Sequence, residues 1–509
     1  MEIAAGIGPN SGAAMVVLGI FWLLFFAAAI ADVRWTLYLF FSSLAFGSLA
    51  ILPVNLTGGT TFLPLTACAG LLCIKAFLAS GRPHLLVDGL IDYNKLGLLT
   101  AFMAFALAVT YTAPFLFSGA PVMGLNNIRR SALGFGSGNI TQPLYLLSSF
   151  AITISIYQLL LQTDTRRLVY KAIFVGGVVA MFAGLLDMAT AGTGLLAPLR
   201  TATYVIMDGD DVGGMRRVIG FNTEASGYGA LVLSFASMIY FMKIGQALGG
   251  VYAKLEMPLA LMLVLLTVLS TSSAAFLGLA VFGLIAVGSN VLALRHGADE
   301  KRAVIELLFI GAAILCCIAL IIATPSLFGG LFDLVDKTVL NKTSSSSFSE
   351  RSSWNTVSLE GLFATGGYGV GVGSTRASSW PVAVLSSTGI VGALLMILFF
   401  LRIFTLSLRG ASHEIRRVVT GARYSILVCM VPGAVAGTLV DFGAYNAALF
   451  AITAALPFLS AVGQPIRRSR RAMHPAPGTG STPAPPAQGQ PSHRGRRRTQ
   501  QRRVRPVRT

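Results

Sequence analysis

The chain has 509 residues, of which 54% are hydrophobic and only 11% are charged, and its mean hydropathy is +0.74. A soluble domain carries about a quarter of charged residues, so this composition excludes a soluble protein. The formal net charge is +18, but twelve arginines and no acidic residue lie between 464 and 509. That segment is also rich in Pro, Gly, Ser and Gln. It is therefore predicted to be a disordered basic tail near anionic headgroups, with no nucleic-acid binding.

Apolar runs long enough to cross a membrane follow one another over residues 1–463. They predict an all-α polytopic transmembrane helix bundle of about 12 to 14 helices. The runs lie near residues 13–31, 36–54, 60–79, 96–117, 143–162, 170–190, 226–242, 255–270, 274–294, 303–324, 381–401, 422–440 and 445–462.

Basic residues in short loops predict the orientation of these spans, because cytoplasmic loops are enriched in Lys and Arg. Such clusters occur on alternate sides of successive spans, at Arg166, Arg167 and Lys171; Lys243 and Lys254; Arg295, Lys301 and Arg302; and Arg402, Arg409, Arg416 and Arg417. Counting the spans from these cytoplasmic loops places the C-terminal tail on the cytoplasmic side as well. Three longer segments, 118–142, 191–225 and 325–380, are then predicted outside, and long loops are often functional.

Arginine on the outer side departs from this charge rule. The arginines concerned are Arg129, Arg130, Arg200, Arg216, Arg217, Arg351 and Arg376. A guanidinium group binds phosphate oxygens in pairs, so several together predict a clamp for a lipid diphosphate. The alternative is that they are interface anchors, or ion-pair partners of Asp208, Asp210, Asp211 and Glu350.

Glu224 lies at the predicted start of a span, where an ionisable group is costly unless it is paired or functional. It could act as a general base or bind a sugar hydroxyl. The alternative is a helix-start carboxylate favoured by the helix dipole, with Asn222 or Thr223 as the cap. Asp187 and Lys75 lie in or near spans and are expected to pair or to reach the interface, without a catalytic role.

The last outer segment combines charged and aromatic residues that suit a folded binding surface: Glu350, Arg351, Trp354, Glu360, Arg376 and Trp380. Its glycine run, Gly366 to Gly373, lacks the spacing of a phosphate-binding loop and predicts tight turns. All five histidines map to the inner side, and the five cysteines lie in apolar runs. No metal site and no disulfide are therefore predicted.

Three sequence blocks resemble the superfamily of bacterial O-antigen ligases and of O-antigen or exopolysaccharide polymerases (Wzy-like). They are Arg216 to Tyr228, the serine turn from Leu269 to Ala275, and the segment from Ser349 to Gly392. The blocks cover the middle and C-terminal parts of the chain, roughly residues 200–395.

This resemblance implies a bundle of the type C glycosyltransferase kind in the bacterial inner membrane, with its active site on the periplasmic face. It implies an undecaprenyl-diphosphate-linked oligosaccharide as the donor, without metal or other cofactor. By local match, Arg216, Arg217 and Arg351, with Arg376, are expected to bind the diphosphate. Glu224 or Glu350 is the hypothetical base. Sugar contacts are expected from the aromatic residues Tyr228, Trp354 and Trp380.

The chain departs from the ligases at the stretch from Arg376 to Pro381, which lacks their histidine, and Ser273 stands where many members have arginine. The sequence Glu224-Ala-Ser226 resembles the exopolysaccharide polymerases, which have an acidic residue and Ala-Ser after the arginine of the first outer loop. The prediction is therefore a polymerase of lipid-linked repeat units, with a chain-length regulator and a flippase as pathway partners. A ligase that moves glycan onto lipid A core or protein, and a transporter of lipid-linked saccharide, remain alternatives.

Overall fold

The computed structural model describes residues 11–52, 61–79, 83–125, 128–203, 205–207, 211–212, 215–295, 297, 300–308, 310–311 and 346–462. All of these belong to the first of two units into which the chain divides, Met1–Gly463. The basic tail, Gln464–Thr509, lies outside the described residues.

Helices dominate the described part of the chain, and nine of them are long and apolar enough to cross a membrane. This confirms the predicted all-α polytopic membrane bundle. The nine helices are α1 (Ser11–Ile30), α5 (Gly97–Leu116), α6 (Gly138–Leu160), α7 (Thr163–Ala189), α8 (Ala225–Met242), α10 (Gly250–Leu269), α11 (Ser273–Arg295), α15 (Trp380–Thr405) and α16 (His413–Ala436).

The remaining described elements complete the fold. They are the helices α2 (Val33–Ser43), α3 (Pro64–Ala79), α4 (Pro83–Ile91), α9 (Ile244–Leu248), α14 (Ser346–Ala364) and α17 (Gly443–Val462), and the 3-10 turn η1 (Ala197–Leu199). Strand β1 (Pro121–Met123) pairs antiparallel with β2 (Arg130–Ala132), and β3 (Asp211–Val212) pairs antiparallel with β4 (Met215–Arg216). The predicted span 303–324 lies mostly outside the described residues.

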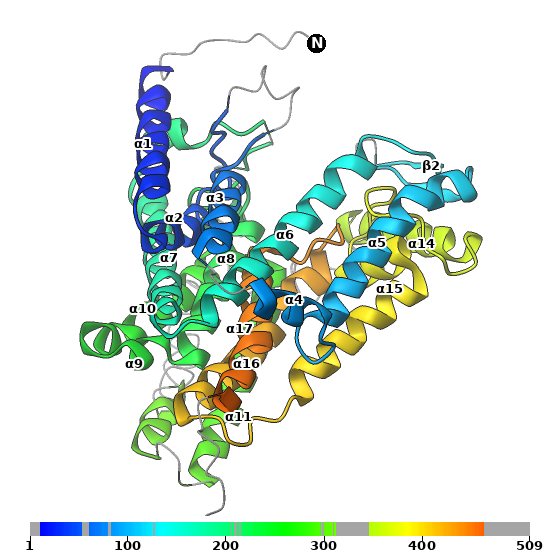
Figure 1. Ribbon diagram of the computed structural model, residues 1–509. Coiled ribbons are helices and arrows are strands. Elements are labelled where there is room, and N and C mark those ends of the chain that lie inside the picture. The colour runs from blue at the N-terminus through cyan, green and yellow to red at the C-terminus, as the bar shows by residue number, and fades with distance from the viewer. Residues whose placement is uncertain are drawn as a thin grey trace, which may run out of the picture. The chain divides into compact units, whose positions relative to one another are not determined.

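Helix α8 forms the centre of the core. It packs against α7, α10, α11 and α16, and 78% of its apolar window is buried. By contrast, α1 is only 11% buried, as expected for a helix that faces lipid. Elsewhere in the bundle, α5 runs beside α15, and α6 runs beside α17 (Figure 1).

The predicted span 36–54 is helical only to Ser43, the last residue of α2. Beyond it the chain turns so that the backbone amide and the hydroxyl of Ser48 both donate to the carbonyl of Phe221, at 3.0 and 2.9 Å. Gly47 lies against Asn222 so closely that a Cβ would come within 2.4 Å of its Oδ1. The helix therefore ends where the chain meets the segment that precedes α8.

Candidate functional site

Asp187 anchors the segment that leads into α8. Its buried carboxylate, near the end of α7, accepts from Nη2 of Arg200 at 2.8 Å and from Nη2 of Arg216 at 3.3 Å. Its second oxygen accepts from the backbone amides of Ile219 and Gly220, at 2.9 and 3.0 Å. Four donors from three parts of the segment therefore converge on one carboxylate and fix the position of Arg216.

Arg217 is held by a different element, the serine turn between α10 and α11. Its Nε donates to Oγ1 of Thr271 at 3.1 Å. Thr271 has φ +48°, a left-handed conformation that is costly for a β-branched residue and is often found at functional sites. The neighbouring Ser270 packs against Gly229 of α8, where a Cβ would lie 2.4 Å from its Oγ. Arg217 is thereby positioned beside the beginning of α8.

Glu224 is the N-cap residue of α8, with φ −149° and ψ 157°. Its side chain makes no cap hydrogen bond, is exposed, and accepts a hydrogen bond from the hydroxyl of Ser226. The helix dipole favours a carboxylate at a helix N-terminus. The cap position is occupied by Glu224 itself and not by Asn222 or Thr223. The exposed carboxylate is thus available to a ligand while the helix still benefits from its charge.

The glycine run Gly366 to Gly373 forms tight turns against the bundle, with positive φ at Gly366, Gly367, Gly369, Gly371 and Gly373. The backbone amide of Val370 donates to the carbonyl of Ser386 at 2.9 Å. At Gly373 a Cβ would lie only 2.0 Å from the carbonyl oxygen of Gly138. The run brings the chain close to α6 and α15, as the sequence predicted for a turn segment.

Arg376 follows the glycine run and lies over Trp354 of α14, with its guanidinium carbon 4.7 Å from the ring centroid. Its backbone amide donates to the carbonyl of Met123 at 3.0 Å, and its own carbonyl accepts from the hydroxyl of Ser358 at 3.0 Å. Its Nε is buried and has no hydrogen-bond partner among the described residues. The side chain is therefore held in place, while its Nε donor has no acceptor among the described residues.

Four charged groups from two distant segments act on one another around Arg376. Burial lowers the pKa of its guanidinium group, the charge of Arg351 lowers that pKa further, and Glu224 and Glu350 raise it. Such charge interactions weaken with distance. Arg351, Glu224 and Glu350, which the sequence predicted separately as base or diphosphate ligands, thus all influence the charge of Arg376.

The arginines predicted to bind a diphosphate divide into two groups. Arg216 pairs with Asp187, and its side chain is 29% exposed. Arg217, Arg351 and Arg376 are half-buried, and within the described ranges none of them has a carboxylate within 4.0 Å. Three cations without an acidic partner suit an anionic ligand better than they suit structural ion pairs.

The three aromatic residues predicted to contact sugar are buried. Tyr228 is fully enclosed and donates to the carbonyl of Ala180 at 3.0 Å. Trp380 donates from Nε1 to the carbonyl of Val440 at 3.0 Å, and Trp354 lies beneath Arg376. Each ring therefore has a packing role in the described structure, and contact with sugar stays a prediction.

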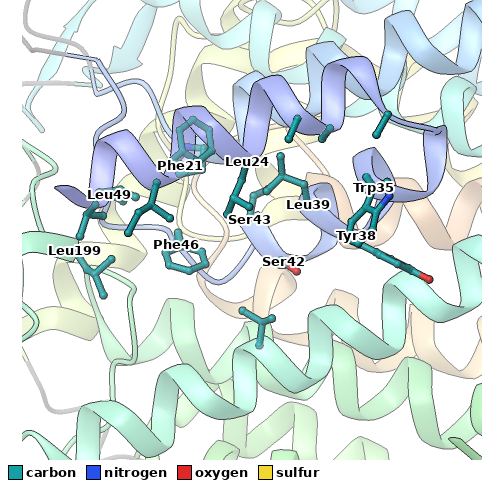
Figure 2. A pocket seen from close by; sticks show the side chains of 17 residues that line it. Phe21, Leu24, Trp35, Tyr38, Leu39, Ser42, Ser43, Phe46, Leu49 and Leu199 are labelled. Carbon is teal, nitrogen blue, oxygen red and sulfur yellow. The ribbon is translucent and has the colours of Figure 1, made fainter. Parts of the chain in front are cut away.

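An apolar groove of about 690 Å³ opens between α1 and α2. Figure 2 shows Phe21 and Leu24 of α1 facing Leu39 and Ser43 of α2 across it. At one end it is lined by Phe46 and Leu199. The ring centroid of Phe46 is 5.1 Å from that of Phe221, and Leu199 directly precedes Arg200. The groove therefore runs along α1, which is largely exposed on the surface of the bundle, and ends beside the arginine-bearing segment.

Sequence reasoning gave Asp187 no role at this site. A carboxylate at the end of an apolar span is tolerated there only when it is paired, and this rule could have drawn attention to Asp187. Its partners are 13 to 33 residues away in sequence, and periodicity alone does not pair them. Within the described residues, no group of three or more His, Cys, Asp or Glu side chains could hold a metal ion.

No protein-family model matches the chain, and no curated protein matches it. The class of protein is nevertheless defined by the fold, because the part of the chain that the structure describes contains nine apolar helices of spanning length, which make this a multi-pass membrane protein. Its candidate site comprises the segment before α8 with the serine turn that holds Arg217, and the loop in which Arg376 lies over Trp354.

Proposed function

We propose that the protein is a membrane glycosyltransferase that polymerises undecaprenyl-diphosphate-linked oligosaccharide repeat units on the periplasmic face of the bacterial inner membrane. The observation that carries this proposal is that Arg376 is half-buried over Trp354, with a buried Nε that has no partner among the described residues. The cluster is Arg376 with the three residues whose charges act on it, Glu224, Glu350 and Arg351. These residues come from the blocks that resemble the superfamily of O-antigen ligases and O-antigen or exopolysaccharide polymerases. The cluster combines cations for a diphosphate with carboxylates that can accept a proton.

The proposed reaction is displacement at the anomeric carbon of the lipid-linked chain. A hydroxyl of the incoming repeat unit forms the new glycosidic bond as the bond to the diphosphate oxygen breaks. Glu224 takes the hydroxyl proton, and Arg351 and Arg376 stabilise the negative charge that develops on the leaving diphosphate. Glu350 is the alternative base. The released polyprenyl diphosphate carries away the bonding electron pair.

The apolar groove between α1 and α2 is the proposed site of the polyprenyl chain. Its walls are mostly aliphatic and aromatic, with few polar groups such as the hydroxyls of Ser42 and Ser43, so a hydrocarbon chain would leave little polar surface unpaired. Its end at Leu199 lies next to Arg200 in the sequence and so near the Asp187 cluster. A lipid held there would present its headgroup toward the arginines.

The first experiment measures the lipid-linked saccharides of a strain that lacks this protein, complemented with the wild type, Arg351→Ala or Arg409→Ala. Arg409 is the control, because it is exposed in the loop between α15 and α16, far along the chain from the cluster. Single repeat units on polyprenyl diphosphate are expected to accumulate on the outer leaflet. The wild type and Arg409→Ala should clear them, and Arg351→Ala should not.

Other results would replace the proposal. Accumulation of long lipid-linked polymer would identify a ligase, which joins finished glycan to an acceptor. Single repeats trapped on the inner leaflet would identify a flippase. Full polymer synthesis by Arg351→Ala would remove the cluster from the mechanism.

A further inference from the structure

A second cavity, of about 370 Å³, lies at the opposite end of α8 from Glu224. It is formed where α8 ends, where α11 approaches its last turns and where α16 begins. Its size is within the range of small-molecule sites. This cavity has no part in the proposed transfer reaction, because the full length of α8 separates it from the cluster around Arg376.

Four basic residues line this cavity: Lys243, His413, Arg416 and Arg417. The rule that cytoplasmic loops are basic accounts for the presence of such residues at this end of the bundle. It does not account for their convergence on one cavity from α16 and from the junction between α8 and α9. Charges that only set orientation would be expected to spread into solvent.

The beginning of α16 carries three basic residues and one carboxylate, Glu414, which is exposed and does not line the cavity. The hydroxyl of Ser412 caps this helix by accepting from the amide of Ile415 at 3.2 Å. His413, Arg416 and Arg417 follow in the first two turns. Cations are disfavoured at a helix N-terminus, and anions are favoured. A bound anion would relieve both this dipole conflict and the mutual repulsion of the basic side chains.

A buried polar network holds Arg417 in position. Its Nη1 donates to Oε1 of Gln246 at 3.1 Å, and the amide of Gln246 donates to Oε2 of the buried Glu256 at 3.0 Å. Nη2 of Arg302 donates to the other oxygen of Glu256 at 2.9 Å. Nε of Arg417 is buried and has no hydrogen-bond partner in the described part of the chain. Arg417 is thus held in position, while its Nε donor has no acceptor among the described residues.

One carboxylate, Glu306, is among the residues that line the cavity, and it is occupied by other partners. It accepts from the hydroxyl of Tyr240 at 2.6 Å, from Nδ2 of Asn290 at 3.0 Å and from Nε of Arg302. Its lone pairs are therefore directed to these donors. The basic side chains on the α16 wall keep an excess of positive charge.

The cavity wall also contains a strained residue. Lys243 adopts φ 50° and ψ 48°, a left-handed conformation that joins α8 to α9 and is costly for a residue other than glycine. On the facing helix, a Cβ at Gly421 would lie 2.2 Å from the carbonyl oxygen of Phe241. The close packing of α8 on α16 and the strained turn together give the cavity a defined shape.

We infer that this cavity binds a phosphate group, with Arg416 and Arg417 as its principal ligands. Arginine is suited to this role because its planar donors match phosphate oxygens in pairs. The group is the headgroup of an anionic phospholipid of the adjacent leaflet or a soluble phosphate compound. The chemistry of recognition is the same for both.

The test measures binding to the purified full-length protein in detergent, with three probes: dioctanoyl phosphatidic acid, dioctanoylglycerol and inorganic phosphate. The variants are Arg416→Gln and Arg417→Gln, with Arg409→Gln as the matched control. Arg416 is exposed, so its replacement should leave the thermal unfolding of the ligand-free protein unchanged. Arg416→Gln is expected to weaken binding about tenfold, and Arg409→Gln is expected to leave it unchanged.

The probes distinguish the source of the phosphate. Binding of phosphatidic acid that depends on Arg416 and is much tighter than that of inorganic phosphate supports a lipid headgroup. Equally tight and Arg416-dependent binding of inorganic phosphate supports a soluble compound. The inference is overturned if neither phosphate probe binds, if dioctanoylglycerol binds as tightly as phosphatidic acid, or if Arg409→Gln weakens binding as much as Arg416→Gln.

Discussion

Asp187 illustrates how a single residue can organise a site without lying at its reacting centre. One buried carboxylate joins the end of α7 to two arginines and two backbone amides. A charge buried in this way is tolerated only because it is paired and hydrogen-bonded. The segment that carries Arg216 and Arg217 therefore depends on a residue outside the sequence blocks that indicated function.

Replacement of Asp187 by Asn keeps the shape of the side chain but removes the negative charge that pairs with Arg200 and Arg216. We expect a loss of roughly 3–5 kcal/mol in the free energy of unfolding, which is typical when one partner of a buried ion pair is removed. The measurement is thermal unfolding of the purified protein in detergent. Asp164→Asn, at an exposed position in the first turn of the same helix, should unfold at the wild-type temperature.

Replacement of Glu224 by Gln tests the proposed base directly. The amide cannot take a proton, so polymer synthesis should be abolished while lipid-linked donor still binds. The measurements are polymer length in cells and donor retention by the purified variant. Glu414→Gln, an exposed carboxylate in the first turn of α16, is the control and should make polymer normally. Normal polymer from Glu224→Gln would shift the role of base to Glu350.

The sequence predicted arginines as ligands at the site but could not distinguish the structural partners of each one. Arg216 and Arg217 are adjacent, yet one pairs with a carboxylate of α7 and the other bonds to a turn between α10 and α11. These partners are set by helix packing, which hydropathy does not encode. The outward charge of Glu224 and the tight turns of the glycine run follow from local rules, and both could be predicted.

Among the elements, α15 departs most clearly from a simple apolar span. Its hydropathy predicts one continuous helix, but Gly389 has φ 69° and ψ −174° and interrupts it. A Cβ there would lie 2.1 Å from the carbonyl oxygen of Tyr368. The kink therefore exists because the glycine run packs against α15 at this residue, a contact between segments that each look regular alone.

Gly389→Ala is expected to destabilise the protein by about 1–2 kcal/mol from the left-handed conformation alone, with a further loss from the contact with Tyr368. The measurement is again thermal unfolding in detergent. Gly283→Ala, within α11 where a Cβ meets nothing within 4 Å, is the matched substitution. It should be neutral or slightly stabilising, because Ala is the better helix former. Equal unfolding temperatures for the two variants would contradict the described kink.

Hydropathy predicted the spans well and their ends poorly. Helix α2 is much shorter than its apolar run because the chain turns to bond with Phe221. The apolar character of a span reflects its lipid or protein surroundings, whereas its end is set by tertiary contacts such as that of Ser48.

At the scale of the whole molecule, the orientation in the membrane is a prediction from the basic loops. Single cysteines can test it in a variant whose five native cysteines are replaced by Ala. A membrane-impermeant maleimide added to intact spheroplasts should label Ser353→Cys, beside the candidate site, and should label Ser407→Cys only after permeabilisation. Both positions are exposed. The reverse pattern would place the candidate site in the cytoplasm and exclude a periplasmic polymerase.

The stacking of Arg376 on Trp354 gives the protein an optical reporter of ligand engagement. The chain has four tryptophans, and in the described structure this one carries a guanidinium group 4.7 Å above its ring. A diphosphate that draws the cation away would change the electrostatic field on the indole and shift its fluorescence. With the other three tryptophans replaced by Phe, emission from Trp354 would follow occupancy of the site in real time, without a labelled sugar and before any bond is made.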